Sequence, residues 1–314
     1  MIESPLSVKV LEIPAPFLFL GVHMDIKKLQ LLMDVADTNN FTKSGERMGY
    51  TQSGVSHILK SLETEIGFPL FIRSKQGVKL TPNAEQILPY IRSMLSRYES
   101  FEQTVNDLNG LETGRLVIAT FASIAINWLP PILHRFGELY PSIDISLIEG
   151  GTDDIVKLLE EDRADFGFVS KRHINSLNWI SLFEDPLVAV VPRDYPAPDN
   201  DLLPIKEFDN EDFIISAHGT DYDIHHALKS SGIKPNMKFS ATDDHTIISM
   251  VSNKLGVSIL PKLMLKNLET QVDSYLLEPY YCRHLGIAVK SKDNLSPAAN
   301  KFIEITKKML PELI

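Results

Sequence analysis

Apolar residues in the first third of the chain recur at the spacing of amphipathic helices. The first set falls at i, i+3, i+4 and i+7: Leu29, Leu32, Met33 and Ala36. Asp25 is placed to cap this helix, and the Asn39-Asn40 pair is placed to end it. Thr42 is placed to cap a second, shorter helix, in which Gly45 allows a neighbouring helix to approach closely. We therefore expect two helices before the turn at Gly49.

A third helix is predicted between Thr51, which can cap it, and Gly67, which suits the left-handed end of a helix. Its apolar face consists of Val55, Ile58, Leu59 and Leu62. Its opposite face is polar: Thr51, Gln52, Ser53, Ser56, His57 and Lys60. Two helices joined by a short glycine turn, the second with such a face, are typical of a helix-turn-helix. A glutamine can pair with adenine and a lysine can neutralise a phosphate, so this face is suited to the major groove of DNA.

The segment that follows this helix, FPLFIRSKQGVKLTP, predicts a hairpin wing with its turn at Gly77. Arg73, Lys75 and Lys79 form a basic run without acids, which we expect to face the DNA backbone. The alternative interpretation of residues 24–82 is a small helical bundle with a solvated polar face.

A long helix is predicted after Thr81-Pro82, because a hydroxyl cap followed by proline is a favourable helix start. Its apolar residues follow an unbroken heptad pattern: Ile87, Ile91, Met94, Tyr98, Phe101, Val105 and Leu108. A helix over residues 83–109 would be about 40 Å long, too long for a small module to cover. We expect this face to pair with the same helix of a second chain. The alternative is docking against the C-terminal part of its own chain.

From residue 115 the pattern changes to short apolar runs that alternate with helices. We predict strands at 116–120, 145–151 and 165–169, with helices at 124–140 and 153–162 between them. This β-α-β-α-β order requires a parallel sheet. A second series has strands at 186–191, 212–216, 238–241, 257–261 and 285–290, with helices near 222–230, 243–253 and 298–309. The fold class is therefore α+β, with two α/β lobes in series and a cleft between them.

Composition and charge narrow the function. The 31 basic and 41 acidic residues give a formal charge of −10, all of it in residues 86–314, whereas residues 24–85 carry +1. The single cysteine excludes an intramolecular disulfide and a zinc cluster of several thiolates. Because no apolar run reaches the length of about 18 residues that spans a bilayer, we expect a cytoplasmic protein. Residues 1–23 are interpreted as an extension outside the fold. The common catalytic and nucleotide-binding motifs are missing, so we expect neither an enzyme nor a catalytic residue.

Five hydroxyl residues at the ends of predicted strands are candidates for contact with a small molecule: Thr120, Ser123, Ser170, Ser216 and Thr242. Ligands of open α/β sheets lie beyond the carboxyl ends of strands, and helix N-termini there attract anions. We therefore expect a small anionic effector at Thr120 and Ser123. The alternative for each residue is a plain helix cap or turn. The cluster of His218, His225, His226 and His245 with Asp221, Asp243 and Asp244 lacks the spacing of a known metal motif, so we assign no metal site and no cofactor.

The run NNFTKSGERMGYTQSGVSHILKSLETEIGFPLFIRSKQGVKLTP resembles the winged helix-turn-helix of the LysR-type transcriptional regulators. Gly54 stands where the family usually has alanine, and His57 stands where it often has arginine. GGTDDI, DFGFV and GVSILP extend the resemblance into the C-terminal part. It implies a domain order of an extension at 1–23, a DNA-binding domain at 24–82, a linker and dimerisation helix at 83–113, and an effector domain at 114–314.

The resemblance also implies that the effector domain is similar to periplasmic solute-binding proteins. Lobe I would comprise residues 114–184 and 287–314, and lobe II residues 185–286. The implied partners are double-stranded DNA, a second chain in a homodimer or homotetramer, a small-molecule effector and RNA polymerase. The alternative function, from another class, is a solute-binding module whose N-terminal bundle only mediates assembly.

Overall fold

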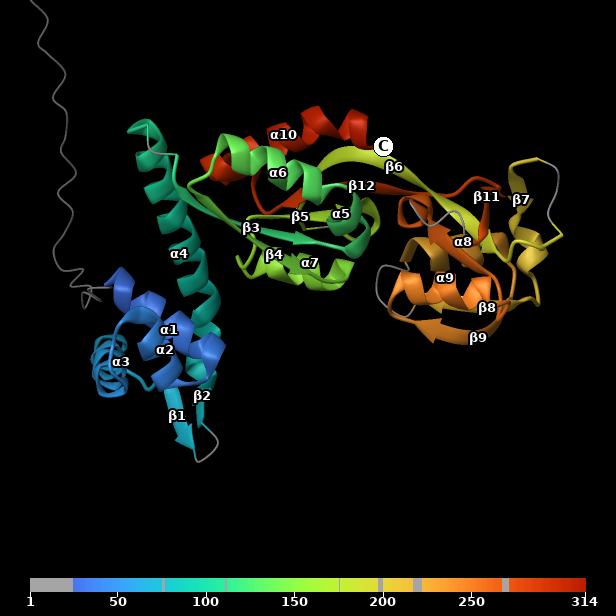
Figure 1. Cartoon of the computed structure of the whole chain (residues 1–314). Coiled ribbons are helices and arrows are strands. Elements are labelled where there is room, and N and C mark those ends of the chain that lie inside the picture. Colours follow the sequence, from blue (N-terminus) through green and yellow to red (C-terminus); the bar gives the residue numbers. More distant parts are fainter. Residues whose placement is uncertain are drawn as a thin grey trace, which may run out of the picture. The chain divides into compact units, whose positions relative to one another are not determined.

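The computed structural model describes residues 25–314, except 75–76, 111, 175, 197–199, 217–221 and 267–270. The prediction for residues 1–23 lies outside this range. The chain divides into two compact units, the first ending at Leu95 and the second beginning at Ser96 (Figure 1).

The first unit contains three short helices and a two-stranded hairpin, followed by the first half of a long helix. These are α1 (Ile26–Thr38), α2 (Phe41–Met48), α3 (Gln52–Ile66), β1 (Phe71–Ser74), β2 (Gly77–Leu80) and α4 (Pro82–Leu108). Strand β1 pairs antiparallel with β2, which confirms the predicted hairpin. The core is formed by apolar residues of all four helices and by Leu70 between α3 and β1.

Side-chain caps define where these helices begin. The predicted caps are confirmed at Asp25, which accepts a hydrogen bond from the backbone of Lys27, and at Thr51, which accepts one from Gly54. The prediction for α2 was wrong, because its cap is Asn40 rather than Thr42. The Asn40 side chain reaches the N–H groups two and three residues ahead, and so the helix begins at Phe41.

The second unit begins with the predicted β-α-β-α-β order. Its elements are β3 (Gly114–Thr120), α5 (Ala122–Asn127), α6 (Leu129–Leu139), β4 (Ile143–Glu149), α7 (Thr152–Glu160), β5 (Phe166–Ser170) and η1 (Lys171–His173). Strand β3 is parallel to both β4 and β5, as predicted. The single helix predicted at 124–140 is instead two helices that meet at Trp128. Pro130 and Pro131 follow this junction and have no N–H to continue the first helix.

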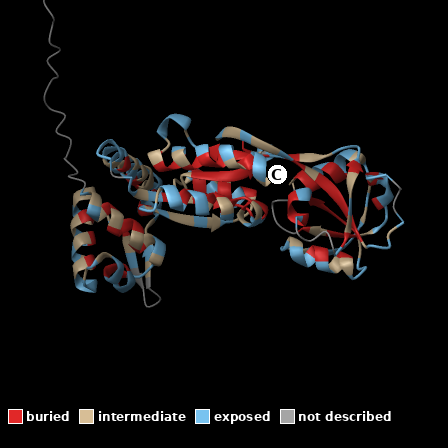
Figure 2. Cartoon of the chain, turned by 45° about the horizontal axis from the view of Figure 1, so that its top comes forward, coloured by how far each residue is buried: buried red, intermediate tan, exposed pale blue. Residues whose placement is uncertain are grey.

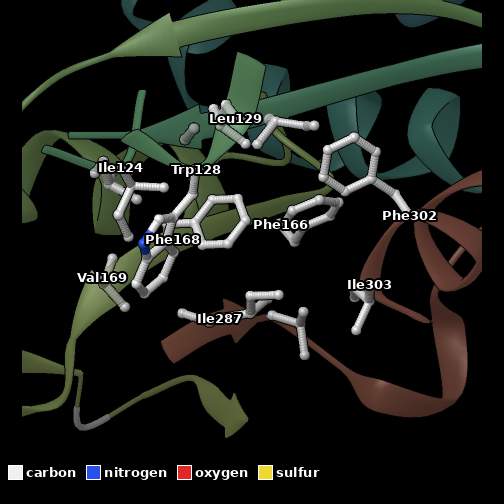
Figure 3. Close-up of a cluster of buried hydrophobic side chains, with 14 of the residues drawn as sticks. Ile124, Trp128, Leu129, Phe166, Phe168, Val169, Ile287, Phe302 and Ile303 are labelled. Atoms are coloured by element: carbon white, nitrogen blue, oxygen red, sulfur yellow. The ribbon is translucent and has the colours of Figure 1, made fainter. Parts of the chain in front are cut away.

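Aromatic side chains fill the core of this first lobe. Figure 3 shows Trp128, Phe166, Phe168 and Phe302 gathered with aliphatic residues from β5, β12 and the C-terminal helix. Phe302 lies on α10 (Pro297–Leu313), so the end of the chain completes the lobe that the segment after Gly114 begins.

The second lobe contains a smaller parallel pair of strands and two helices. Its elements are β7 (Leu202–Pro204), η2 (Ile205–Phe208), β8 (Asp212–Ser216), α8 (Tyr222–Ser231), β9 (Asn236–Ala241), α9 (Asp244–Ser252), β10 (Ser258–Pro261), η3 (Lys262–Leu265) and β11 (Asp273–Glu278). Strand β8 is parallel to β9. The strands β7 and β11 were not predicted. The lobe has its own buried clusters on either side of β6. Figure 2 shows the burial of each part of the chain by colour.

Two long strands connect the lobes. They are β6 (Asn178–Val191) and β12 (Cys282–Val289), followed by η4 (Lys292–Asn294). They pair antiparallel with each other, β12 also pairs with β5, and β6 also pairs with β10 and β11. The resulting strand order is β4-β3-β5-β12-β6-β11-β7. The chain therefore crosses between the lobes twice, on neighbouring strands.

Candidate functional site

The polar face of α3 is open to solvent. Gln52, Ser53, His57 and Lys60 are exposed, whereas Val55, Leu59 and Leu62 on the opposite side are buried in the core. Thr51 is exposed as well and serves as the cap, and Ser56 is half-buried. The helix therefore presents the predicted residues together on one surface.

Parts of the predicted wing are described. Lys79 is exposed on β2, opposite Ile72 in register. The backbone of Arg73 lies in β1, but its side chain is outside the described residues, and so is all of Lys75. The contribution of these two bases to DNA binding stays a prediction.

The predicted heptad face of α4 is divided in two. Ile91 is buried, and Ile87 packs beside it in the core of the first unit. These two positions therefore already have partners in their own chain. The later positions are open: Phe101 is 63% exposed and Leu108 82% exposed, with Met94 and Val105 also exposed and Tyr98 half-buried. An apolar face that remains exposed over the second half of the helix is suited to a partner helix.

A cavity of about 510 Å³ lies between the two lobes of the second unit. Lobe I contributes the start of α5, the loop after β4 and the first turn of α7, through Phe121, Ala122, Ile126, Glu149, Gly150, Gly151, Asp153 and Asp154. Lobe II contributes the start of α9 and part of η3, through Thr242, Asp243, Asp244, His245 and Met264. Three strand-to-helix junctions thus line the same cavity. This agrees with the rule that ligand sites of open α/β sheets lie beyond the carboxyl ends of the strands.

Only Thr242 among the five predicted hydroxyl residues lines this cavity. Thr120 is fully buried and its hydroxyl bonds to the carbonyl of Phe121. The Ser170 hydroxyl donates to Asp223 at 2.8 Å, and Ser216 is buried at the end of β8. Ser123 is buried and accepts a hydrogen bond from Arg283. Four of the five therefore do not belong to the cavity surface.

Carboxylates dominate the charge of the cavity wall. Five of them line it, and the described lining residues include no lysine or arginine. At two of the helix N-termini there, these acids already accept a backbone hydrogen bond: Asp154 from the N–H of Gly151, and Asp243 from that of His245. The third helix, α5, has no side-chain cap. An incoming anion would meet the like charges of the five carboxylates. Burial raises the pKa of Asp244, partly offset by the nearby Arg283.

A buried ion pair lies under the cavity where the strands cross between lobes. Arg283 of β12 is 4% exposed and Asp185 of β6 is 1% exposed, and their Nη2 and Oδ2 atoms are 2.7 Å apart. The same guanidinium donates to Ser123 at 2.8 Å and lies over the ring of Phe121. Asp185 also accepts the N–H of Leu263 at 3.0 Å. The pair therefore ties both crossing strands to the two walls of the cavity.

Two further contacts join the lobes directly. The Tyr222 hydroxyl donates to Asp153 at 2.7 Å, and Arg172 forms an ion pair with the buried Asp223 at 2.7 Å. Sequence reasoning missed these residues, since each partner comes from a different lobe and no local pattern links them.

The predicted histidine and aspartate cluster is dispersed. His245, Asp243 and Asp244 line the cavity, His225 and His226 lie on α8, and His218 and Asp221 lie outside the described residues. Within the described ranges, none of these residues belongs to a group of convergent metal-binding side chains. The described helices also include none that is long and apolar enough to span a membrane.

Comparisons with known proteins match both units. A family model described as the LysR substrate binding domain matches residues 109–311, and one described as a bacterial regulatory helix-turn-helix protein of the lysR family matches residues 26–85. YvbU of Bacillus subtilis, an uncharacterized HTH-type transcriptional regulator, is 29% identical over 91% of this chain and 99% of its own length. The HTH-type transcriptional regulator SoxR of an Arthrobacter species is 30% identical over 90% and 97%.

Solved structures share the fold. A full-length OxyR from Pseudomonas aeruginosa covers 93% of this chain and 99% of its own, with a TM-score of 0.73 and 20% identity. CbnR complexed with its target DNA covers 91% and 100%, with a TM-score of 0.52 and 18% identity. The effector binding domain of QuiR in complex with shikimate covers 64% and 98%, with a TM-score of 0.57 and 20% identity. At these identities the likeness concerns the fold.

Proposed function

This chain belongs to the LysR family of transcriptional regulators, and from that premise we propose that it responds to a small molecule carrying a positive charge, bound in the cavity between its lobes. The observation that carries the proposal is the set of carboxylates in the cavity wall without a lysine or arginine among the described lining residues. The anion expected from the sequence relied on Thr120 and Ser123, and both are buried away from this surface.

The two carboxylates best placed to bind such a molecule are Glu149 and Asp244. Within the described part of the chain, neither accepts a hydrogen bond, whereas Asp153, Asp154 and Asp243 each do. Glu149 comes from lobe I and Asp244 from lobe II, so an ammonium or guanidinium group between them would attract both walls. Such a ligand would stabilise the closed arrangement of the lobes, because it interacts less with either wall alone.

The apolar residues that line the cavity indicate the rest of the molecule. Phe121, Ile126 and Met264 supply an apolar surface. The volume of about 510 Å³ suits a small organic compound rather than a bare ion. We therefore expect an amine or guanidine with a short apolar portion.

The output of this response is DNA binding by the exposed face of α3. CbnR binds its target DNA with the same fold. Gln52 and Ser53 would contact bases, while Lys60 and Lys79 would contact phosphates. The exposed half of α4 would pair with a second chain and so present two recognition helices to one operator. The alternative of a solute-binding module with an assembly bundle is not favoured, because the helix-turn-helix family model covers residues 26–85.

The test uses pairs of small compounds that share a carbon skeleton and differ in carrying an amine or a carboxylate. Binding would be measured as a rise in melting temperature, since a ligand selective for the folded state stabilises it. We expect amines to be selected and the affinity derived from the temperature shift to fall about ten-fold or more in Asp244→Asn, because a charge-assisted bond is worth roughly 1.5–3 kcal/mol. Asp144→Asn, an exposed acid on β4 outside the cavity, is the matched control and should respond like the wild type. Selection of the carboxylates would contradict the proposal.

A further inference from the structure

A second group of chemically distinct side chains lies on the crossing strands, on the face opposite the buried ion pair. His284 of β12 stands directly opposite Glu184 of β6 in the antiparallel register. Cys282 lies two residues before His284, so its side chain is on the same face of the strand. Arg283 and Asp185, the neighbours between them, point to the other face and are buried there. Because side chains alternate between the two faces of a strand, the buried Arg283–Asp185 pair lies on one face, and Glu184, Cys282 and His284 lie on the other, accessible face.

We propose that Glu184, Cys282 and His284 form a binding site for a divalent ion of the zinc class. One ligand atom from each residue lies within 4.8 Å of the other two. The Nδ1 atom of His284 is 3.4 Å from the Glu184 carboxylate, and its Nε2 atom is 3.9 Å from the Cys282 sulfur. In a tetrahedral zinc site, bond lengths of about 2.0–2.3 Å separate neighbouring ligand atoms by roughly 3.3–3.8 Å. Only one ring nitrogen of His284 can bind a given ion, so the imidazole and the other two side chains would turn toward one point on binding.

The surroundings allow that adjustment. The side chains of His284 and Glu184 are 45% and 65% exposed, and Cys282 is partly exposed, so none of the three is held by core packing. The backbone is held in place, because residues 282–284 of β12 pair in register with residues 184–186 of β6. A fixed backbone with adjustable side chains is a workable arrangement for a metal site.

The choice of donors determines the class of ion. Thiolate, imidazole and carboxylate together favour zinc and similar transition metals over calcium or magnesium, which prefer oxygen alone. Three protein ligands leave a fourth position for water. Binding would replace the thiol proton by the ion, releasing one proton to solvent and forming one metal–sulfur bond.

The position of the thiol also points to a cation. Cys282 lies in one cluster with the Glu184 carboxylate, and a bound cation is the partner that would make a thiolate beside a carboxylate favourable. The site is independent of the proposed effector cavity, whose lining residues are all different.

The single cysteine of the chain makes a direct test possible, since a thiol reagent reports on Cys282 alone. Metal-free full-length protein would be labelled with a chromogenic disulfide, with and without zinc chloride. We expect micromolar zinc to slow labelling at least ten-fold and a chelator to restore it. His284→Gln and Glu184→Gln should each weaken this protection about ten-fold or more, given that even supporting partners of metal ligands contribute that much. His134→Gln, an exposed histidine on α6, is the control and should keep it.

Cobalt provides a second readout that does not depend on labelling. Cobalt chloride should produce a sulfur-to-cobalt charge-transfer band in the wild type, and Cys282→Ser should abolish it. Labelling that is indifferent to zinc would overturn the proposal. So would protection that persists unchanged in both His284→Gln and Glu184→Gln, because a thiol alone would then be the binding group.

Discussion

Removal of Asp185 should destabilise the second unit far more than removal of the whole ion pair. In Asp185→Ala the Arg283 guanidinium loses its counter-charge and the N–H of Leu263 loses its acceptor, both in a buried setting. Breaking a buried pair by removing one partner costs about 3–5 kcal/mol. Replacing both residues by apolar ones, Asp185→Leu with Arg283→Met, leaves no buried charge and should cost less than either single change. If the single variant is less stable than the double variant, the difference is due to the unpaired charge of Arg283 and not to lost packing.

The assay is urea unfolding followed by tryptophan fluorescence. Both tryptophans of the chain, Trp128 and Trp179, belong to the second unit, so the signal reports this unit alone. Ser123→Ala is the graded control: it removes one hydrogen bond to the guanidinium and should cost roughly 1.5–3 kcal/mol. A cost below about 1 kcal/mol for Asp185→Ala, or a double variant as unstable as the sum of its single changes, would contradict this prediction.

Three other predictions concern the first unit and the linker. Gln52→Ala should lose discrimination at one base pair, by roughly 1–3 kcal/mol in a gel-shift series. Lys60→Ala should weaken binding to all DNA duplexes alike and reduce the slope of log affinity against log salt concentration by about one. Equal effects of both variants on specific and random DNA would contradict these separate roles. The double variant Met94→Asp with Phe101→Asp would bury charge in an apolar interface, so it should sediment as a monomer while the second unit stays folded. An unchanged dimer would exclude the exposed apolar face of α4 as the interface. Gly45→Ala should lower stability by about 1–3 kcal/mol in thermal unfolding, because the added Cβ would lie 2.6 Å from the carbonyl oxygen of Tyr50; wild-type stability would show that this contact relaxes freely.

Local signals in the sequence predicted most of the first unit. The apolar periodicity placed α1, α3 and α4, since each buries one face against a common core. The cap of α2 was misplaced because Asn40 and Thr42 are both suitable residues, and the choice depends on backbone angles that the sequence does not display. Periodicity also could not show that Ile87 and Ile91 pack within their own unit while Phe101 does not.

The site was harder to predict because its walls come from distant segments. Asp153 and Asp243 were visible as helix-start residues, but only the fold brings them to one cavity with Glu149 and Asp244. The cavity does lie at strand ends, but only Thr242 of the five hydroxyl residues chosen there lines it. The sequence pattern does not show which side chains at a strand end face the cavity. The pairing of Glu184 with His284 depends on strand register, which no local motif encodes.

The most direct test of the proposed function is to identify the small molecule that co-purifies with the full-length protein, by native mass spectrometry followed by release and fragmentation. We expect a compound with an amine or guanidine group, retained by the wild type and by Asp144→Asn but lost from the double variant Glu149→Gln with Asp244→Asn. A retained compound whose charged groups are all anionic, or one that survives the double substitution, would contradict the proposed function.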